Sequence, residues 1–259
     1  MLRSIGLLVT AVILVVMTTG CVTSESGGIA QNADPDKAEA TFVRLGLAYL
    51  QNGNRDASKE NFEKALKINS RSAAANEGIA RLYQLDAEKE LAEKHFKLAL
   101  RYDSTLSRAH NNYGNFLYDE GRYEEAYDQF EQAAENVSYE NRAAALLNLG
   151  RTAKKLGRMD RARASFEHAA NLRPNFAVVL EELAEITFQD GDYAKSKQYL
   201  NRHDNLTRPT ARTLFLCIRI EHIFENRDRE ASCALQLKNL HQYSQELLDY
   251  REWVANNSE

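Results

Sequence analysis

The sequence predicts an all-α protein, built as a stack of about six antiparallel helical hairpins. The first observation is a pattern of small and aromatic residues that returns every 34 residues from Glu39 onward. The second is composition, because the 259 residues include only three Pro, while the strong helix formers Ala, Leu, Glu and Lys are abundant. One pair of helices cannot bury its apolar face alone, so the copies are expected to stack in chain order.

Five copies of the repeat are expected, over residues 39–72, 73–106, 107–140, 143–176 and 177–210, with Asn141 and Arg142 inserted before the fourth. In each copy a small residue lets the two helices approach closely; these are Gly46, Ala80, Gly114, Gly150 and Ala184. An aromatic side chain fills the space between one hairpin and the next; these are Phe62, Phe96, Phe130, Phe166 and Tyr199. Glycine at positions 53, 121, 157 and 191 supplies the left-handed backbone that ends a first helix.

A sixth, degenerate hairpin is expected over residues 211–240. Its first helix is predicted from Ala211 to Glu225, its turn near Asn226, and its second helix from about Asp228. The last segment, 241–256, is predicted to form a helix that caps the open end of the stack. Its apolar residues are spaced like one helix face; they are Leu247, Tyr250 and Val254.

The repeat resembles the tetratricopeptide repeat (TPR), and the resemblance covers residues 39–210. The match is specific because several positions recur in phase over five copies. The resemblance implies a right-handed superhelical solenoid in which the first helix of each hairpin lines the concave surface. Such a surface is suited to holding another polypeptide.

The N-terminal residues 1–20 have the pattern of a secretion signal. One positive charge, Arg3, precedes an apolar run from residue 5 to residue 17, which is too short to span a bilayer. Gly20-Cys21 at its end resembles a bacterial lipobox, although Thr18 stands where Leu is usual. We expect lipidation of Cys21, and the alternative is an ordinary cleaved signal with a chance Cys.

Residues 21–36 are expected to form the lipidated N-terminus and a flexible linker, because they are polar, contain Gly and Ser and have no apolar period. The linker should end at Asp34-Pro35-Asp36. Pro suits the first position of a helix, and Asp suits its positive end. The solenoid is therefore assigned to residues 37–259.

The two remaining cysteines, Cys217 and Cys233, form an even pair if Cys21 carries lipid. Export would place them in an oxidising compartment, where such pairs persist as disulfides. Both flank the predicted turn of the sixth hairpin, and their positions are near neighbours when its two helices run antiparallel. We predict a Cys217–Cys233 disulfide, with two buried free thiols as the alternative.

No catalytic chemistry is evident in the sequence. The net charge of −4 gives no electrostatic footprint for nucleic acid or for anionic lipid. The six His are scattered, and no metal-binding, nucleophile or phosphate-binding motif is found. Glu124-Glu125 and Glu181-Glu182 are expected on solvated helix faces. We therefore predict a protein that is not an enzyme and that uses neither cofactor nor metal.

The positions expected to face the concave groove change character along the chain. They are apolar in the first hairpin and polar or charged later; they are Val43, Leu47, Leu50, Asn111, Asn115, Tyr118, Arg151, Lys154, Glu181 and Glu185. This pattern predicts an extended peptide or a helix lying along the groove, with an apolar anchor near the membrane end. The alternative for Val43, Leu47 and Leu50 is that they pack as core.

A lipoprotein signal, a short tether, about six TPR hairpins and a Cys pair in the last hairpin together resemble the PilF/PilW family of type IV pilus biogenesis proteins. The resemblance implies an outer-membrane pilotin, lipid-anchored at the periplasmic face, which binds the secretin subunit of the pilus pore and promotes its localisation and multimerisation. Val22 after the Cys agrees with sorting to the outer membrane. The alternative is an adaptor of the NlpI type, which recruits peptidoglycan hydrolases.

Overall fold

The computed structural model describes residues 34–256, and within this range every regular element is an α-helix. The helices are α1 Pro35–Gln51, α2 Arg55–Ile68, α3 Ala73–Leu85, α4 Lys89–Tyr102, α5 Ser107–Asp119, α6 Tyr123–Glu135, α7 Arg142–Lys155, α8 Met159–Leu172, α9 Ala177–Gln189, α10 Tyr193–Asp204, α11 Ala211–Ile223, α12 Arg227–Leu240 and α13 Gln245–Asn256. Between residues 34 and 256, no helix combines the length and the apolar character needed to cross a bilayer. The signal, Cys21 and most of the linker lie outside the described residues.

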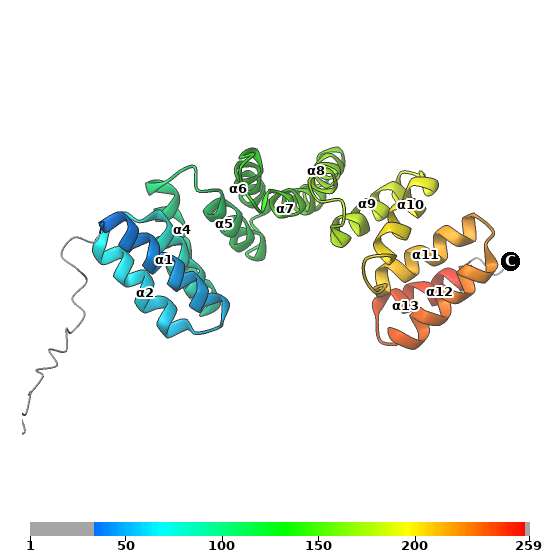
Figure 1. The fold of residues 1–259 in the computed structure, drawn as a ribbon. Helices are drawn as coiled ribbons and strands as arrows, with labels where there is room; N and C mark the ends of the chain where they lie inside the picture. Colours follow the sequence, from blue (N-terminus) through cyan, green and yellow to red (C-terminus); the bar gives the residue numbers. More distant parts are fainter. Residues whose placement is uncertain (1–33, 257–259) are drawn as a thin grey trace, which may run out of the picture.

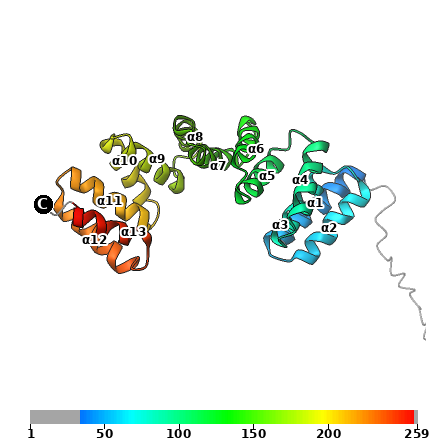
Figure 2. The ribbon, with the colours of Figure 1, turned by 180° about the vertical axis from the view of Figure 1, so that it is seen from behind.

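The helices pair in chain order into six hairpins, and each hairpin stacks on the next (Figures 1 and 2). The result is an arc with α1 and α2 at one end and α11 to α13 at the other. The chain thus forms an all-α TPR superhelix. Of the two inserted residues, Asn141 ends the connection between α6 and α7 and Arg142 begins α7, where its Nε donates to the carbonyl oxygen of Ala134 at 2.6 Å.

The aromatic side chains between hairpins are almost completely buried. Phe62, Phe96 and Phe166 have no exposed surface, and Phe130 has 1%. A methyl group on Gly46 would lie 2.6 Å from the Phe62 ring, and one on Gly78 of the next hairpin would lie 2.2 Å from it. Phe62 therefore fills the space between two hairpins because glycine on both sides leaves room for it.

In the fifth hairpin, the buried residue is Leu200, and the sequence-based assignment of Tyr199 is wrong. Leu200 is 2% exposed, whereas Tyr199 is only partly buried. Leu200 lies 34 residues after Phe166, so the strict period holds and only the residue type changes. At the next equivalent position, His203 replaces the small Ala169, and it is also buried.

The turns within hairpins use the left-handed backbone that glycine favours. Gly53, for example, has φ of +75°. The second and sixth hairpins make the same turn without glycine, at Ala87 with φ of 59° and Glu225 with φ of 55°. A residue with a Cβ is strained in this conformation by about 1–2 kcal/mol. At these two positions the residue present is therefore less favourable than glycine for the backbone conformation of the turn.

The first and last helices begin and end close to their predicted positions. Asp34 caps α1 by accepting from the Asp36 backbone N–H at 3.1 Å. At the other end, α13 packs on α11 through Leu247, Tyr250 and Trp253. The predicted face included Val254, which is instead 36% exposed. The capping face therefore runs through Trp253.

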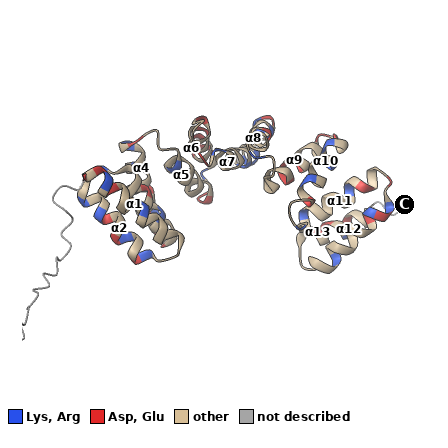
Figure 3. Cartoon of the chain, viewed as in Figure 1, with Lys and Arg blue, Asp and Glu red and all other residues tan. Residues whose placement is uncertain are grey.

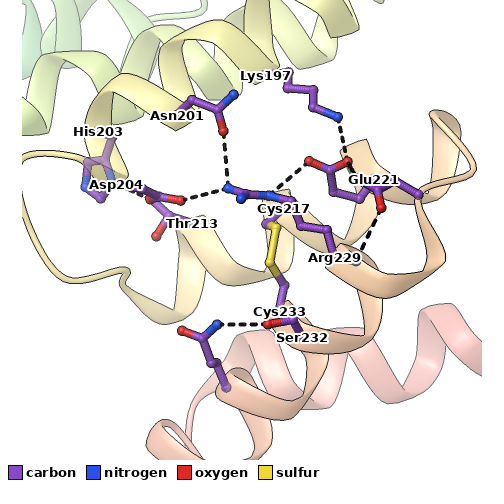
Figure 4. The surroundings of a disulfide bond; sticks show 12 residues. Lys197, Asn201, His203, Asp204, Thr213, Cys217, Glu221, Arg229, Ser232 and Cys233 are labelled. Atoms are coloured by element: carbon purple, nitrogen blue, oxygen red, sulfur yellow. Dashed lines mark hydrogen bonds and ion pairs between the residues drawn. A yellow bond between two sulfur atoms is a disulfide. The ribbon is translucent and has the colours of Figure 1, made fainter.

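The sixth hairpin is stapled by a disulfide between Cys217 on α11 and Cys233 on α12, whose Cα atoms are 6.3 Å apart (Figure 4). Both residues are buried. Ion pairs also join this hairpin to α10: Glu221 accepts from Lys197 at 2.6 Å, and the Arg229 Nη2 lies 3.7 Å from the Asp204 carboxylate. The last hairpin is thus held to the fifth by ion pairs as well as by apolar contacts.

Candidate functional site

A groove with a volume of about 650 Å³ lies across the first helices of the third, fourth and fifth hairpins, α5, α7 and α9. These helices follow one another along the arc (Figure 1). Four predicted groove positions, Asn115, Tyr118, Arg151 and Lys154, line it. The TPR pattern predicts this because it directs the same face of every first helix inward.

A row of asparagines crosses the floor of this groove. The Asn148 Nδ2 donates to the Oδ1 of Asn115 at 3.0 Å and to that of Asn111 at 3.3 Å. Asn111 is 9% exposed, so it acts mainly through these bonds rather than as open surface. The Asn115 carboxamide uses its oxygen here, and its N–H groups remain as donors for the groove.

A charge network forms the other side of the groove and corrects the expectation that Glu181-Glu182 is a solvated pair. The Glu182 carboxylate is 6% exposed and accepts from the Arg151 Nε at 3.1 Å and the Lys154 Nζ at 3.0 Å. Arg212 of α11 reaches the same carboxylate at 3.3 Å. Glu182 is therefore buried by cations from the hairpins before and after its own.

The neighbouring carboxylates of α9 complete the network. Glu181 pairs with Arg212 at 3.2 Å, and Glu185 pairs with Arg219 at 3.4 Å. Both carboxylates are less than one-fifth exposed. They point toward the sixth hairpin, so they act between hairpins rather than as part of the open groove. Glu124, in contrast, is 65% exposed, as expected for a solvated face.

The pKa of Glu182 reflects two opposing effects. Burial by itself raises the pKa of this carboxyl group. The charges of Arg212 and Lys154 and the hydrogen bonds from them outweigh this effect and lower the pKa to about 2. The carboxylate is therefore ionised at any physiological pH. Its role is electrostatic, because a group with this pKa is a poor general acid or base near neutral pH.

A second, apolar groove lies at the N-terminal end, with a volume of about 470 Å³. Val43 and Leu47 of α1 line it together with Ala74 and Leu106, the residue that precedes α5. Leu50, the third predicted apolar position, is 7% exposed and packs in the core with Phe62. Core packing is thus right for Leu50, while Val43 and Leu47 belong to both the core and the groove wall.

Sequence reasoning missed a second buried carboxylate, Glu77 of α3. It has no exposed surface and accepts from the Arg108 Nε at 3.0 Å and the Asn112 Nδ2 at 2.6 Å, both on α5. The recurring separation of 31 residues is a signal that could have found it, because Arg108–Glu77, Arg151–Glu182 and Arg212–Glu181 all share it. Between residues 34 and 256, no group of His, Cys, Asp and Glu is arranged to hold a metal ion.

Comparison with known families agrees with this architecture. Family models of the tetratricopeptide repeat match residues 34–72, 105–175 and 147–206. The chain is 36% identical over 244 residues to the type IV pilus assembly protein PilF of Pseudomonas aeruginosa, and the match covers 94% of this chain and 96% of that protein. An uncharacterized protein of Haemophilus influenzae is 28% identical over 159 residues.

Solved structures give the same result. The structure of Pseudomonas aeruginosa PilF matches with a TM-score of 0.79 and 35% identity, covering 84% of this chain and 98% of that one. The pilus biogenesis factor PilW matches with a TM-score of 0.67 at 24% identity, covering 82% and 97%, which shows a shared fold. The identity to PilF over almost the whole chain goes further than the fold. The chain belongs to the PilF family of tetratricopeptide-repeat proteins of type IV pilus biogenesis.

Proposed function

We propose that this protein is a pilotin, which binds the secretin subunit of the type IV pilus machinery and promotes its localisation and multimerisation. Membership of a pilus assembly family supports a role in this machinery and implies protein partners. The observation that carries the proposal is the apolar groove beside α1, at the end of the solenoid where the N-terminal tether joins it.

The groove suits one apolar face of a short helix or a few apolar side chains. Val43 and Leu47 of α1 give it an apolar lining, and charged side chains also line it; these are Asp36, Glu39, Arg44 and Arg108. Apolar contact area accompanied by polar groups is expected of a protein interface. A secretin segment seated here would lie close to the membrane that its subunit must enter.

The anchor is the second part of the proposal. Acyl chains on Cys21 would hold the protein at the periplasmic face of the outer membrane, and two or more chains anchor firmly where one is marginal. The tether of residues 22–34, which precedes α1, would have an r.m.s. span of roughly 20 Å. Confinement within this distance of one surface raises the effective concentration of bound subunits, which favours their assembly.

Capture of the secretin tests the contact surface. We expect the protein to retain the secretin from envelope extracts, and Leu47→Asp to abolish retention because it buries a charge in the apolar groove. Leu45→Asp is the matched control, because Leu45 lies on the same helix, is 41% exposed and does not line the groove. Retention by Leu47→Asp would exclude this groove as the contact.

Deletion of the gene separates the pilotin from the peptidoglycan adaptor. Loss of pili and of twitching, with the secretin left monomeric, supports the pilotin. Altered cell shape with intact pili would instead support the adaptor. The anchor is tested by feeding cells radiolabelled palmitate: an unlabelled protein that stays soluble on fractionation would refute lipidation of Cys21.

A further inference from the structure

The groove across α5, α7 and α9, called the central groove below, carries more cationic than anionic side chains. Arg151 and Lys154 share one carboxylate, that of Glu182, and Arg212 competes for it from the other side. Arg151 and Lys154 are 42% and 31% exposed, so their remaining N–H groups reach solvent. Lys155 also lines the groove and makes no ion pair with any residue between 34 and 256.

Hydrogen-bond donors are also in excess in this groove. The Nε contact with Glu182 is the one hydrogen bond that the described part of the chain gives Arg151, which leaves its two terminal amino groups to donate. The Asn115 carboxamide retains its N–H groups, and Tyr118, whose side chain carries a hydroxyl donor, lines the same groove. A carboxylate, which only accepts hydrogen bonds, is the complement of such a surface.

We propose that this groove recognises an acidic side chain in the middle of an extended polypeptide segment. The ligand carboxylate would lie beside Arg151 and Lys154 as the second anion of the network, within reach of the Asn115 amide. This charge arrangement is local, because acidic and basic residues are interspersed over the rest of the arc (Figure 3). Recognition therefore depends on the position of the acidic residue and not on the net charge of the partner.

The location of the cations favours an internal residue over a chain end. Arg151 and Lys154 lie on α7, the middle one of the three helices that form the groove. Packed helices lie about 8–10 Å apart, so a segment crossing from α5 to α9 covers about 20 Å. About six extended residues span this distance, which leaves chain on both sides of the acidic residue.

This inference rests on the proposed function only in taking the ligand to be a polypeptide. Its test uses three fluorescein-labelled peptides of Gly and Ser with a central residue pair, measured by fluorescence anisotropy on the full chain. The first has a central Glu pair and an amidated end, the second a Gln pair and an amidated end, and the third a Gln pair and a free carboxylate end. We expect the first to bind about tenfold more tightly than the other two.

Variants assign the binding to the groove. Arg151→Gln with Lys154→Gln should remove the advantage of the Glu peptide. Lys94→Gln with Arg101→Gln, which removes the same charge from exposed positions of α4, should leave it unchanged. Glu182→Gln should increase it severalfold, because the resident carboxylate no longer competes for the cations. If Glu182 had only a structural role, its replacement would not increase the affinity for the Glu peptide. Glu182→Gln therefore tests the proposal even if the double variant fails to fold.

Equal binding of the Glu and Gln amides would overturn the proposal, as would preference for the free carboxylate end or an unchanged affinity in Glu182→Gln. Failure here is distinguishable from failure of the pilotin proposal. Secretin capture that depends on Leu47 with no preference among the peptides would leave the pilotin intact. A peptide preference without secretin capture would leave the groove assignment intact.

Discussion

Replacing Glu182 with Gln should lower the free energy of unfolding at neutral pH and remove part of its acid dependence. The pKa of this carboxyl group falls from an ordinary 4.5 to about 2 in the folded protein. A shift of this size corresponds to about 3 kcal/mol of stability. The side chain is 6% exposed, so solvent screens the interaction only slightly.

The direction of the pH effect follows from the lowered pKa. The ionised carboxylate contributes its full stabilisation above the unfolded pKa of 4.5, and the contribution is lost as the pH falls toward about 2. About 1.4 kcal/mol should already be lost at a pH of about 3.5. Glu182→Gln has no such titration, so its stability should fall less over the same interval.

The assay is urea unfolding at neutral pH and near pH 3.5, followed by the fluorescence of Trp253, the sole tryptophan. Trp253 lies on α13 with its ring centroid 4.8 Å from that of His222 on α11. It therefore reports on the sixth hairpin, which Glu182 joins to the fifth through Arg212, and this matters because a solenoid can unfold in parts. Glu124→Gln is the control, since an exposed ion pair contributes less than about 1 kcal/mol. An identical acid dependence in Glu182→Gln and the natural protein would refute the reasoning.

Three further predictions concern the fold. Ala87→Gly should raise the free energy of unfolding by about 0.5–1 kcal/mol, because it relieves a left-handed residue; Ala164→Gly, in an exposed helix interior, should lower it by about the same amount. Gly78→Ala should lower the melting temperature, since its methyl group would meet Phe62 at 2.2 Å, at a cost of about 1–3 kcal/mol. The Cys217–Cys233 bond should block alkylation of both thiols until the periplasmic protein is reduced, and Cys217→Ser with Cys233→Ser should lower stability by about 3 kcal/mol. Two thiols that alkylate without reduction would reject the bond.

The hairpin architecture could be predicted from the sequence because the residues that determine it recur at fixed spacing. Phe62 requires a small residue on each neighbouring helix. Within its own copy of the repeat this residue is Gly46, so the requirement is visible in the sequence. In the fifth copy, residue type favours the aromatic Tyr199 for this position. Counting 34 residues from Phe166 gives Leu200, which the structure buries. Period is therefore a better guide than residue type in a degenerate repeat.

The burial of Glu182 could not be predicted from hydrophobic pattern, because a pattern of apolar positions treats every carboxylate as solvated. What buries Glu182 is a set of cations 28 to 31 residues away along the chain. A related limit applies to Leu50, for which groove and core both stood open, and to Val254, which was expected on the capping face but is 36% exposed. Spacing assigns a residue to a helix face, but the width of the neighbouring element decides whether that face is core or surface.

The two roles assigned to Glu182 predict opposite effects of one substitution, Glu182→Gln, on stability and on binding. As a link between hairpins, its loss lowers stability, since Arg151, Lys154 and Arg212 lose their shared anion. As the resident competitor in the groove, its loss frees the same cations for the carboxylate of a partner. A residue that only maintained the fold would weaken both properties together. A variant that is less stable and yet binds an acidic segment more tightly can arise only if the network serves recognition as well as folding.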